Sequence, residues 1–225
     1  MDISYSNNPG CTAARVDLTG GETCTTEGGA MIAMSGSMTV TTTTHKRGSG
    51  GLLAAAKRML AGESIFLNHY TAPASGGHLY LASALPGDMT TLELTDKAII
   101  ASGQSFVCSE ESVDVGVGWQ GFKSFFSGER VFWVKLTGQG KAVVNSFGAI
   151  YPVEVEDDMI VDTGHIVAFE ESLSFKISKA GKSWIGSFLG GEGLVCRFSG
   201  TGTVWCQSHN PPSFGNLLGP NLRTR

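Results

Sequence analysis

The residues best suited to chemistry form an Asp-Thr-Gly motif at 162–164, with apolar residues on both sides. This pattern is typical of aspartic proteases, in which two carboxylates share one site so that one of them holds the proton. The chain has no second Asp-Thr-Gly motif, so a dimer would have to supply the other carboxylate. One hypothesis is therefore a hydrolase that uses Asp162. The alternative, which we favour, is that Asp162 belongs to a turn.

Other patterns for catalysis or metal binding are weaker. The chain has no Gly-x-Ser-x-Gly motif, and the Gly-Ser-Gly-Gly stretch at 48–51 lacks the Lys-Ser/Thr pair of a phosphate-binding loop. The five histidines form no HxH or HxxxH pair of metal ligands; they are His45, His69, His78, His165 and His209. We therefore expect no catalytic residue, no metal ion and no cofactor.

A Gly-Glu pair followed by apolar residues occurs three times. The pairs are Gly62-Glu63, Gly128-Glu129 and Gly191-Glu192, and the glutamates are separated by 66 and then 63 residues. The three carboxylates could converge on a cation or a cationic ligand. Alternatively, each could accept hydrogen bonds from turn amides in a structural unit that is built three times. We favour the structural interpretation.

A second repeat supports this interpretation. Segments 33–40, 108–115 and 168–175 each begin with a small residue, carry serine fifth and an apolar residue sixth, and follow a glycine: Gly29, Gly103 or Gly164. Their alternation of apolar and polar residues predicts half-buried strands. Alignment on the three glycines places Asp162 beside Ala101 and Glu27, so the acid is not repeated.

The repeats predict one all-β domain over residues 1–225, with pseudo-threefold symmetry. Two units are complete in the sequence, and the third is expected to be split, with the two chain ends jointly completing it. Closing the chain in this way would also hide sheet edges, which are otherwise prone to aggregation. A tail rich in Pro, Gly and Asn, 208–225, is predicted to be irregular.

One short helix is predicted at 51–60, where apolar residues recur at i, i+3 and i+4. Four basic residues lie in or just before it: Lys46, Arg47, Lys57 and Arg58. They could contact an anionic partner or a membrane surface. The alternative, which we favour, is that the helix only covers a sheet.

The composition indicates a β protein with few charges. Charged residues make up 16% of the chain, below the roughly 25% of a typical soluble domain. The net charge of −4 opposes general nucleic-acid binding, which needs a basic field. The sequence shows no signal peptide and no apolar run long enough to span a bilayer, so we expect a cytoplasmic protein, with peripheral membrane contact as the alternative.

Taken together, the motifs resemble those of the AIM24 family, formerly a domain of unknown function. The residues that carry the resemblance are 57–68, Leu85-Pro86-Gly87-Asp88, 127–140, 161–175 and 191–207. The family's pattern continues after Gln207 with Thr-Arg, whereas this chain has Ser208-His209. The resemblance implies a fold like that of tryptophan-sensing RNA-binding attenuator proteins (TRAP-like, related to the double-stranded β-helix). It also implies oligomers without established enzymatic activity and, for mitochondrial relatives, a link to inner-membrane organisation.

We therefore predict a non-enzymatic oligomeric scaffold or interaction protein, a trimer or a multiple of one, with a protein partner or peripheral membrane contact. The first alternative is a nucleic-acid or small-ligand binding module of TRAP-like fold, although a shared fold does not transfer RNA binding. The hydrolase that uses Asp162 is the second alternative.

Overall fold

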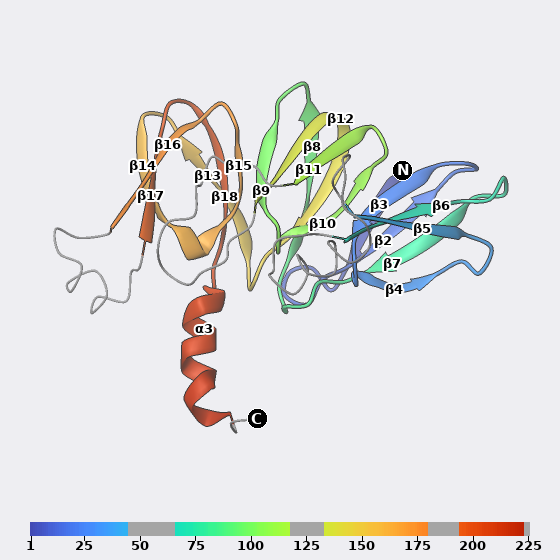
Figure 1. Ribbon diagram of the computed structural model, residues 1–225, viewed down its shortest axis with the longest axis horizontal. Helices are drawn as coiled ribbons and strands as arrows, with labels where there is room; N and C mark the ends of the chain where they lie inside the picture. The colour runs from blue at the N-terminus through green and yellow to red at the C-terminus, as the bar shows by residue number, and fades with distance from the viewer. Residues whose placement is uncertain (45–65, 118–132, 180–193, 223–225) are drawn as a thin grey trace.

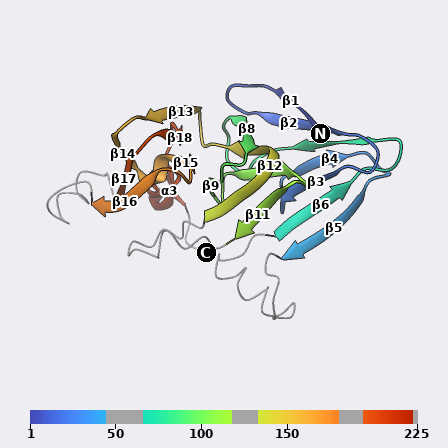
Figure 2. The ribbon, with the colours of Figure 1, turned by 90° about the horizontal axis from the view of Figure 1, so that it is seen from above.

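The computed structural model describes residues 1–44, 66–117, 133–179 and 194–222. Nearly all regular structure in these ranges is antiparallel β-sheet, which confirms the all-β prediction. The strands form three successive units, which Figures 1 and 2 show side by side, with the second unit between the first and the third.

Each unit contains the same series of strands. Unit 1 comprises β2 (Ala13–Leu18), β3 (Thr23–Glu27), β4 (Met31–Met34), β5 (Thr39–Thr44), β6 (Phe66–Thr71) and β7 (Gly77–Leu81), preceded by β1 (Asp2–Ser6). Unit 2 comprises β8 (Met89–Thr95), β9 (Ile99–Ser102), β10 (Phe106–Glu110), β11 (Val113–Val117) and the long β12 (Trp133–Asn145), which takes the place of two strands. Unit 3 comprises β13 (Ile150–Val155), β14 (Asp158–Asp162), the 3₁₀ turn η1 (Thr163–His165), β15 (Ile166–Glu170), β16 (Ser174–Lys179), β17 (Leu194–Ser199) and β18 (Gly202–Gln207).

The pairing inside the units is also the same, and it divides each unit into two half-sheets. The first half-sheet is β2-β7-β4 in unit 1, β8-β12-β10 in unit 2 and β13-β18-β15 in unit 3. The second half-sheet is β3-β6-β5, β9-β12-β11 and β14-β17-β16, respectively. The same strand pairing therefore recurs in all three units.

A shift in register recurs at the same place in every unit. It lies between Met31 and Ala33 in β4, between Phe106 and Cys108 in β10, and between Ile166 and Ala168 in β15. Because such an irregularity re-aims the strand that carries it, its repetition places Ala33, Cys108 and Ala168 at equivalent positions.

Strand pairing also joins the units. β10 of unit 2 pairs antiparallel with β3 of unit 1, and β15 of unit 3 pairs antiparallel with β9 of unit 2. At each junction, the first half-sheet of one unit thus continues the second half-sheet of the unit before it. The two junctions share β12, which merges them into one 11-stranded sheet.

Three clusters of buried apolar side chains follow the units. They centre on Leu79 and Leu81 in unit 1, on Phe106 and Leu136 in unit 2, and on Phe169 and Phe198 in unit 3. Each of the first two clusters also takes residues from the next unit, such as Cys108 in the first cluster and Ala168 in the second. Burial at the junctions therefore binds the three units into one body.

The structure corrects the prediction that the chain ends jointly complete a third unit. β2 pairs with β1 and β7, and β18 pairs with β13 and β15, so no described strand pair links the two ends of the chain. Each unit is contiguous because its last strand returns to its first. The serines also differ from expectation: Ser37, Ser112 and Ser172 lie in the turns that connect two strands rather than within a strand.

The tail contains a helix where the sequence predicted irregular structure. α3 (Pro211–Leu218) is followed by the 3₁₀ turn η2 (Gly219–Asn221). Asn210 caps α3 by accepting the backbone N–H of Ser213 at 3.2 Å, and the two prolines fall at the first helical positions, where their missing N–H groups cost nothing. The helix predicted at 51–60 lies outside the described residues.

Candidate interaction site

The structure describes only some of the residues singled out in the sequence. All three Gly-Glu pairs, and the basic residues Lys46, Arg47, Lys57 and Arg58, lie outside the described residues. Gly29, Gly103 and Gly164 each lie in the short turn before the strand that carries the register shift. Only Gly29 of these three adopts a positive φ, of 99°, which favours glycine.

Asp162 has a structural contact in the turn that it begins. Its carboxylate accepts the backbone N–H of Gly164 at 2.7 Å, and the Asn210 side-chain amide donates to the same oxygen at 3.4 Å. Asp162, Ser102 and Glu27 are the last residues of equivalent strands. In the strand pairing, Asp162 is therefore equivalent to Ser102. Alignment on the glycines had predicted that it would be equivalent to Ala101.

Asp88, the acid of the Leu-Pro-Gly-Asp motif, also makes structural contacts. Its buried carboxylate accepts the N–H of Gly10 at 2.7 Å and the hydroxyl of Thr12 at 3.2 Å. A β-carbon on Gly87 would collide with the carbonyl oxygen of Ser146. This motif therefore fixes the connection between units 1 and 2 to the loop before β13.

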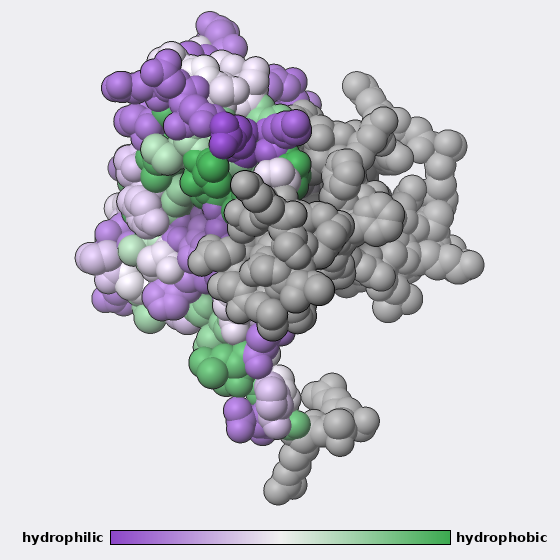
Figure 3. Space-filling view, turned by 90° about the vertical axis from the view of Figure 1, so that its left-hand side faces the viewer, coloured by the Kyte–Doolittle hydropathy of each residue, from purple (hydrophilic) through white to green (hydrophobic). Residues whose placement is uncertain are grey.

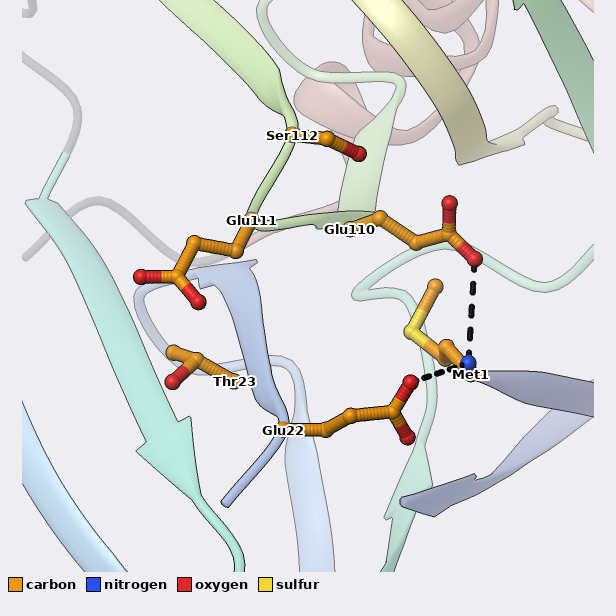
Figure 4. Close-up of a pocket in the computed structure, with 6 residues that line it drawn as sticks. All are labelled: Met1, Glu22, Thr23, Glu110, Glu111 and Ser112. Atoms are coloured by element: carbon orange, nitrogen blue, oxygen red, sulfur yellow. Dashed lines mark hydrogen bonds and ion pairs between the residues drawn. The ribbon is translucent and has the colours of Figure 1, made fainter. Parts of the chain in front are cut away.

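An open acidic cleft of about 400 Å³ lies where the β10–β11 turn meets the start of β3. Figure 4 shows its lining residues, Met1, Glu22, Thr23, Glu110, Glu111 and Ser112. The terminal ammonium of Met1 lies 2.7 Å from Glu22 and 3.8 Å from Glu110. That ammonium is the largest cause, and the backbone N–H of Thr19 the next, of a pKa of Glu22 that is lowered to about 2. The Met1 ammonium thus links Glu22 of unit 1 to Glu110 of unit 2 at the junction between these units.

The described residues contain no cluster of metal ligands, and four of the five cysteines are buried. Within the described ranges, no group of three or more His, Cys, Asp or Glu side chains could hold a metal ion. All five cysteines are free, and burial raises the pKa of Cys196 to about 12 and that of Cys206 to about 11. These two thiols stay protonated at neutral pH and are poor nucleophiles.

The first half-sheet of unit 1 ends in an exposed apolar strand. No described strand pairs with the outer edge of β4, and Met31, Ile32 and Ala33 are exposed, with Ile32 at 56%. The equivalent strands β10 and β15 carry apolar residues at the same places. These residues are buried, and both strands pair with the neighbouring unit. β4 thus has the composition of a junction strand, but its outer edge has no described partner.

The second half-sheet of unit 3 ends in the same way. β14 forms the outer edge of the β14-β17-β16 sheet, with Met159 and Ile160 exposed, Ile160 at 52%. The equivalent residues of β9, Ile99 and Ile100, are buried against β15. Figure 3, which views the molecule from the unit 3 end, shows hydrophobic surface among hydrophilic residues there and again on α3.

Sequence reasoning missed these two edges although a signal was present. The segments Met31–Met34 and Asp158–Asp162 are apolar at the positions where their equivalents in the other units are apolar. Nothing in the sequence shows, however, that one copy of a repeated strand has an outer edge without a partner, because the residues of a strand do not record which strand lies beside it.

Comparison with known proteins identifies relatives over almost the whole chain. The family model described as "Mitochondrial biogenesis AIM24" matches residues 4–209. The uncharacterized protein M6_Spy0233 of Streptococcus pyogenes serotype M6 is 30% identical over 215 residues, which are 93% of this chain and 86% of that protein. The crystal structure of protein SPYM3_0169 from Streptococcus pyogenes has a TM-score of 0.80 at 28% identity, covering 98% of this chain and 99% of that one.

Among the described helices, none has the length and apolar content needed to cross a membrane.

Proposed function

Because the chain belongs to the AIM24 family, whose model spans residues 4–209, we propose that it is a non-enzymatic interaction protein that works as a homo-oligomer. The observation that carries this proposal is the pair of exposed apolar edges, β4 and β14, in a protein whose equivalent strands in the middle of the row are buried. Natural sheets blunt exposed edges with lysine, proline or bulges that turn the edge away. Neither β4 nor β14 contains lysine or proline. β4 carries a register shift, but β10 and β15 carry the same shift and still pair with the neighbouring unit.

Self-association would remove both edges from water. The side chains of Met31, Ile32, Met159 and Ile160 are all more than one-third exposed, and contiguous exposed apolar surface of this kind marks interaction sites. The assembly we propose is a trimer or a multiple of one.

Light scattering on the purified protein at micromolar concentration tests the proposal. We expect a mass that is a multiple of the 23.6 kDa chain, three or six times that value for a trimer or a dimer of trimers. A mass of 23.6 kDa over the whole micromolar range would contradict it. An acid protease activity that disappears in Asp162→Asn would instead support the hydrolase.

Peripheral membrane contact is a second candidate function, favoured by the tail. α3 and the turn after it expose Phe214, Leu217, Leu218 and Leu222, and residues 208–222 contain no Asp, Glu, Lys or Arg. Sedimentation with vesicles of anionic and of neutral lipid tests this function. Binding that Leu217→Glu abolishes would support it, whereas binding that survives this change would exclude α3 as the contact.

A further inference from the structure

The two ends of the molecule carry complementary halves of one structure. Each internal junction joins three strands of a second half-sheet to three strands of a first half-sheet: β5-β6-β3 to β10-β12-β8, and β11-β12-β9 to β15-β18-β13. Two half-sheets remain without a described neighbour, β4-β7-β2 with β1 at one end and β14-β17-β16 at the other. They are one first half-sheet and one second half-sheet.

We infer that β14 of one copy pairs antiparallel with β4 of a second copy, which forms a third junction of the same kind between molecules. This inference rests on the proposed self-association and names the strands and the register that produce it. Because the two paired surfaces differ, the contact is head-to-tail, and it closes into a ring when the rotation between copies permits.

The internal junctions fix the register. Cys108 lies opposite Thr26 at the first junction and Ala168 opposite Ala101 at the second. Cys108 and Ala168 follow the register shift, as Ala33 does in β4. Thr26 and Ala101 are the next-to-last residues of their strands, as Val161 is in β14. The third junction therefore sets Ala33 opposite Val161, Met34 opposite Ile160 and Ser35 opposite Met159.

The side chains fit this register. The pair equivalent to Met34 and Ile160 at the second junction is Phe169 and Ile100, and both of those residues are fully buried in the core of unit 3. Met34 already packs against the core of unit 1, and Ile160 is half exposed, so their contact would complete an apolar pair of the same type.

Charge is consistent with the same pairing. At the second junction Lys97, two residues before Ile99, lies 3.4 Å from Glu170. The corresponding residues of the third junction are Asp157 and Ser35. A glutamate at the position of Ser35 would face an aspartate, whereas the serine hydroxyl leaves the acidic residue without a like charge opposite it.

Charge exchange across the predicted pair tests the inference. In Met34→Lys and in Ile160→Glu, every junction between copies carries one unpartnered charge, so each variant should give the 23.6 kDa mass of a single chain. The double variant Met34→Lys/Ile160→Glu should recover the mass of the parent assembly, because the introduced lysine then faces the introduced glutamate at every junction. Tyr151→Glu, at an exposed residue of β13, is the matched control and should leave the mass unchanged.

Cysteine cross-linking gives an independent measure of register, with Cys11→Ser in every chain because Cys11 is the one exposed cysteine. Copies with Met34→Cys should form a disulfide with copies carrying Ile160→Cys, and not with copies carrying Met159→Cys. A parent assembly that survives both charge variants, or that cross-links only through Met159→Cys, would overturn the inference and leave the homo-oligomer intact. A parent protein that is monomeric throughout would overturn the proposed function itself.

Discussion

Ala168 lies directly opposite Ala101 in the strand pairing that joins unit 3 to unit 2, and both side chains are fully buried. Ala33 occupies the equivalent position in β4 and is exposed. Within the same molecule, one position of the repeat therefore occurs both with and without a described partner across a junction. Comparing the two isolates what the junction contributes.

The first prediction uses this contrast. Ala168→Glu would bury a carboxylate without a partner at the internal junction, so we expect a loss of about 3 kcal/mol or more in the free energy of unfolding. Ala33→Glu would place the same group at the exposed edge and should change the free energy of unfolding of a single chain by less than about 0.5 kcal/mol. Urea denaturation at low protein concentration measures both, and equal losses would show that burial at the junction does not distinguish the two positions.

The second prediction concerns pH. Burial raises the pKa of Glu27 from its usual 4.5 to about 7. The folded chain therefore keeps a proton that the unfolded chain releases between pH 4.5 and 7, so this group lowers stability progressively as the pH rises through that window. Glu27→Gln should remove this loss and be more stable than the parent at about pH 8, by on the order of 1–2 kcal/mol after solvent screening.

Urea denaturation at about pH 4, 6 and 8, which brackets the two pKa values, checks this expectation. The difference between Glu27→Gln and the parent should be small at the lowest pH and grow towards the highest. Glu93→Gln, at an exposed residue of β8, is the control for a general effect of removing one carboxylate. A difference that is the same at every pH would disprove the role of Glu27.

The third prediction concerns Asp162. Asp162→Asn keeps an oxygen that can accept the N–H of Gly164, so it should alter stability only modestly. Asp162→Ala removes that acceptor and should cost about 1 kcal/mol, a typical loss for a capping side chain. Thermal melts of the two variants decide between these effects, and an equal loss in both would mean that the negative charge, not the hydrogen bond, matters.

The fourth prediction concerns the tail. Asn210→Ala removes the cap of α3, which should destabilise the helix by about 0.5–2 kcal/mol. Since Phe214 packs against Phe147 at 5.1 Å between ring centroids, fraying should also expose Phe147. Circular dichroism and hydrogen exchange at 211–218 measure the change, with Asn210→Asp, which also caps helices well, as the control. Unchanged exchange in Asn210→Ala would show that the cap is not needed.

The sequence alone determined the class of the fold. Glycines at turns and alternating residues such as Val113, Asp114 and Val115 in β11 reflect local backbone preferences, which act within a few residues and so can be read from the chain. The wrong prediction at 208–225 came from counting Pro and Gly as breakers, although two prolines at the start of a helix are compatible with it.

Only the tertiary structure decided how the units connect and which strands have an outer edge without a described partner. The strands β4, β10 and β15 carry similar apolar residues at their first three positions. These residues are buried in β10 and β15 and exposed in β4. Whether an apolar strand is buried depends on a partner from another unit, many residues away in the chain, and no local preference records it. The candidate site is therefore a property of arrangement: equivalent strands differ in role because the row of units ends at β4 on one side and at β14 on the other.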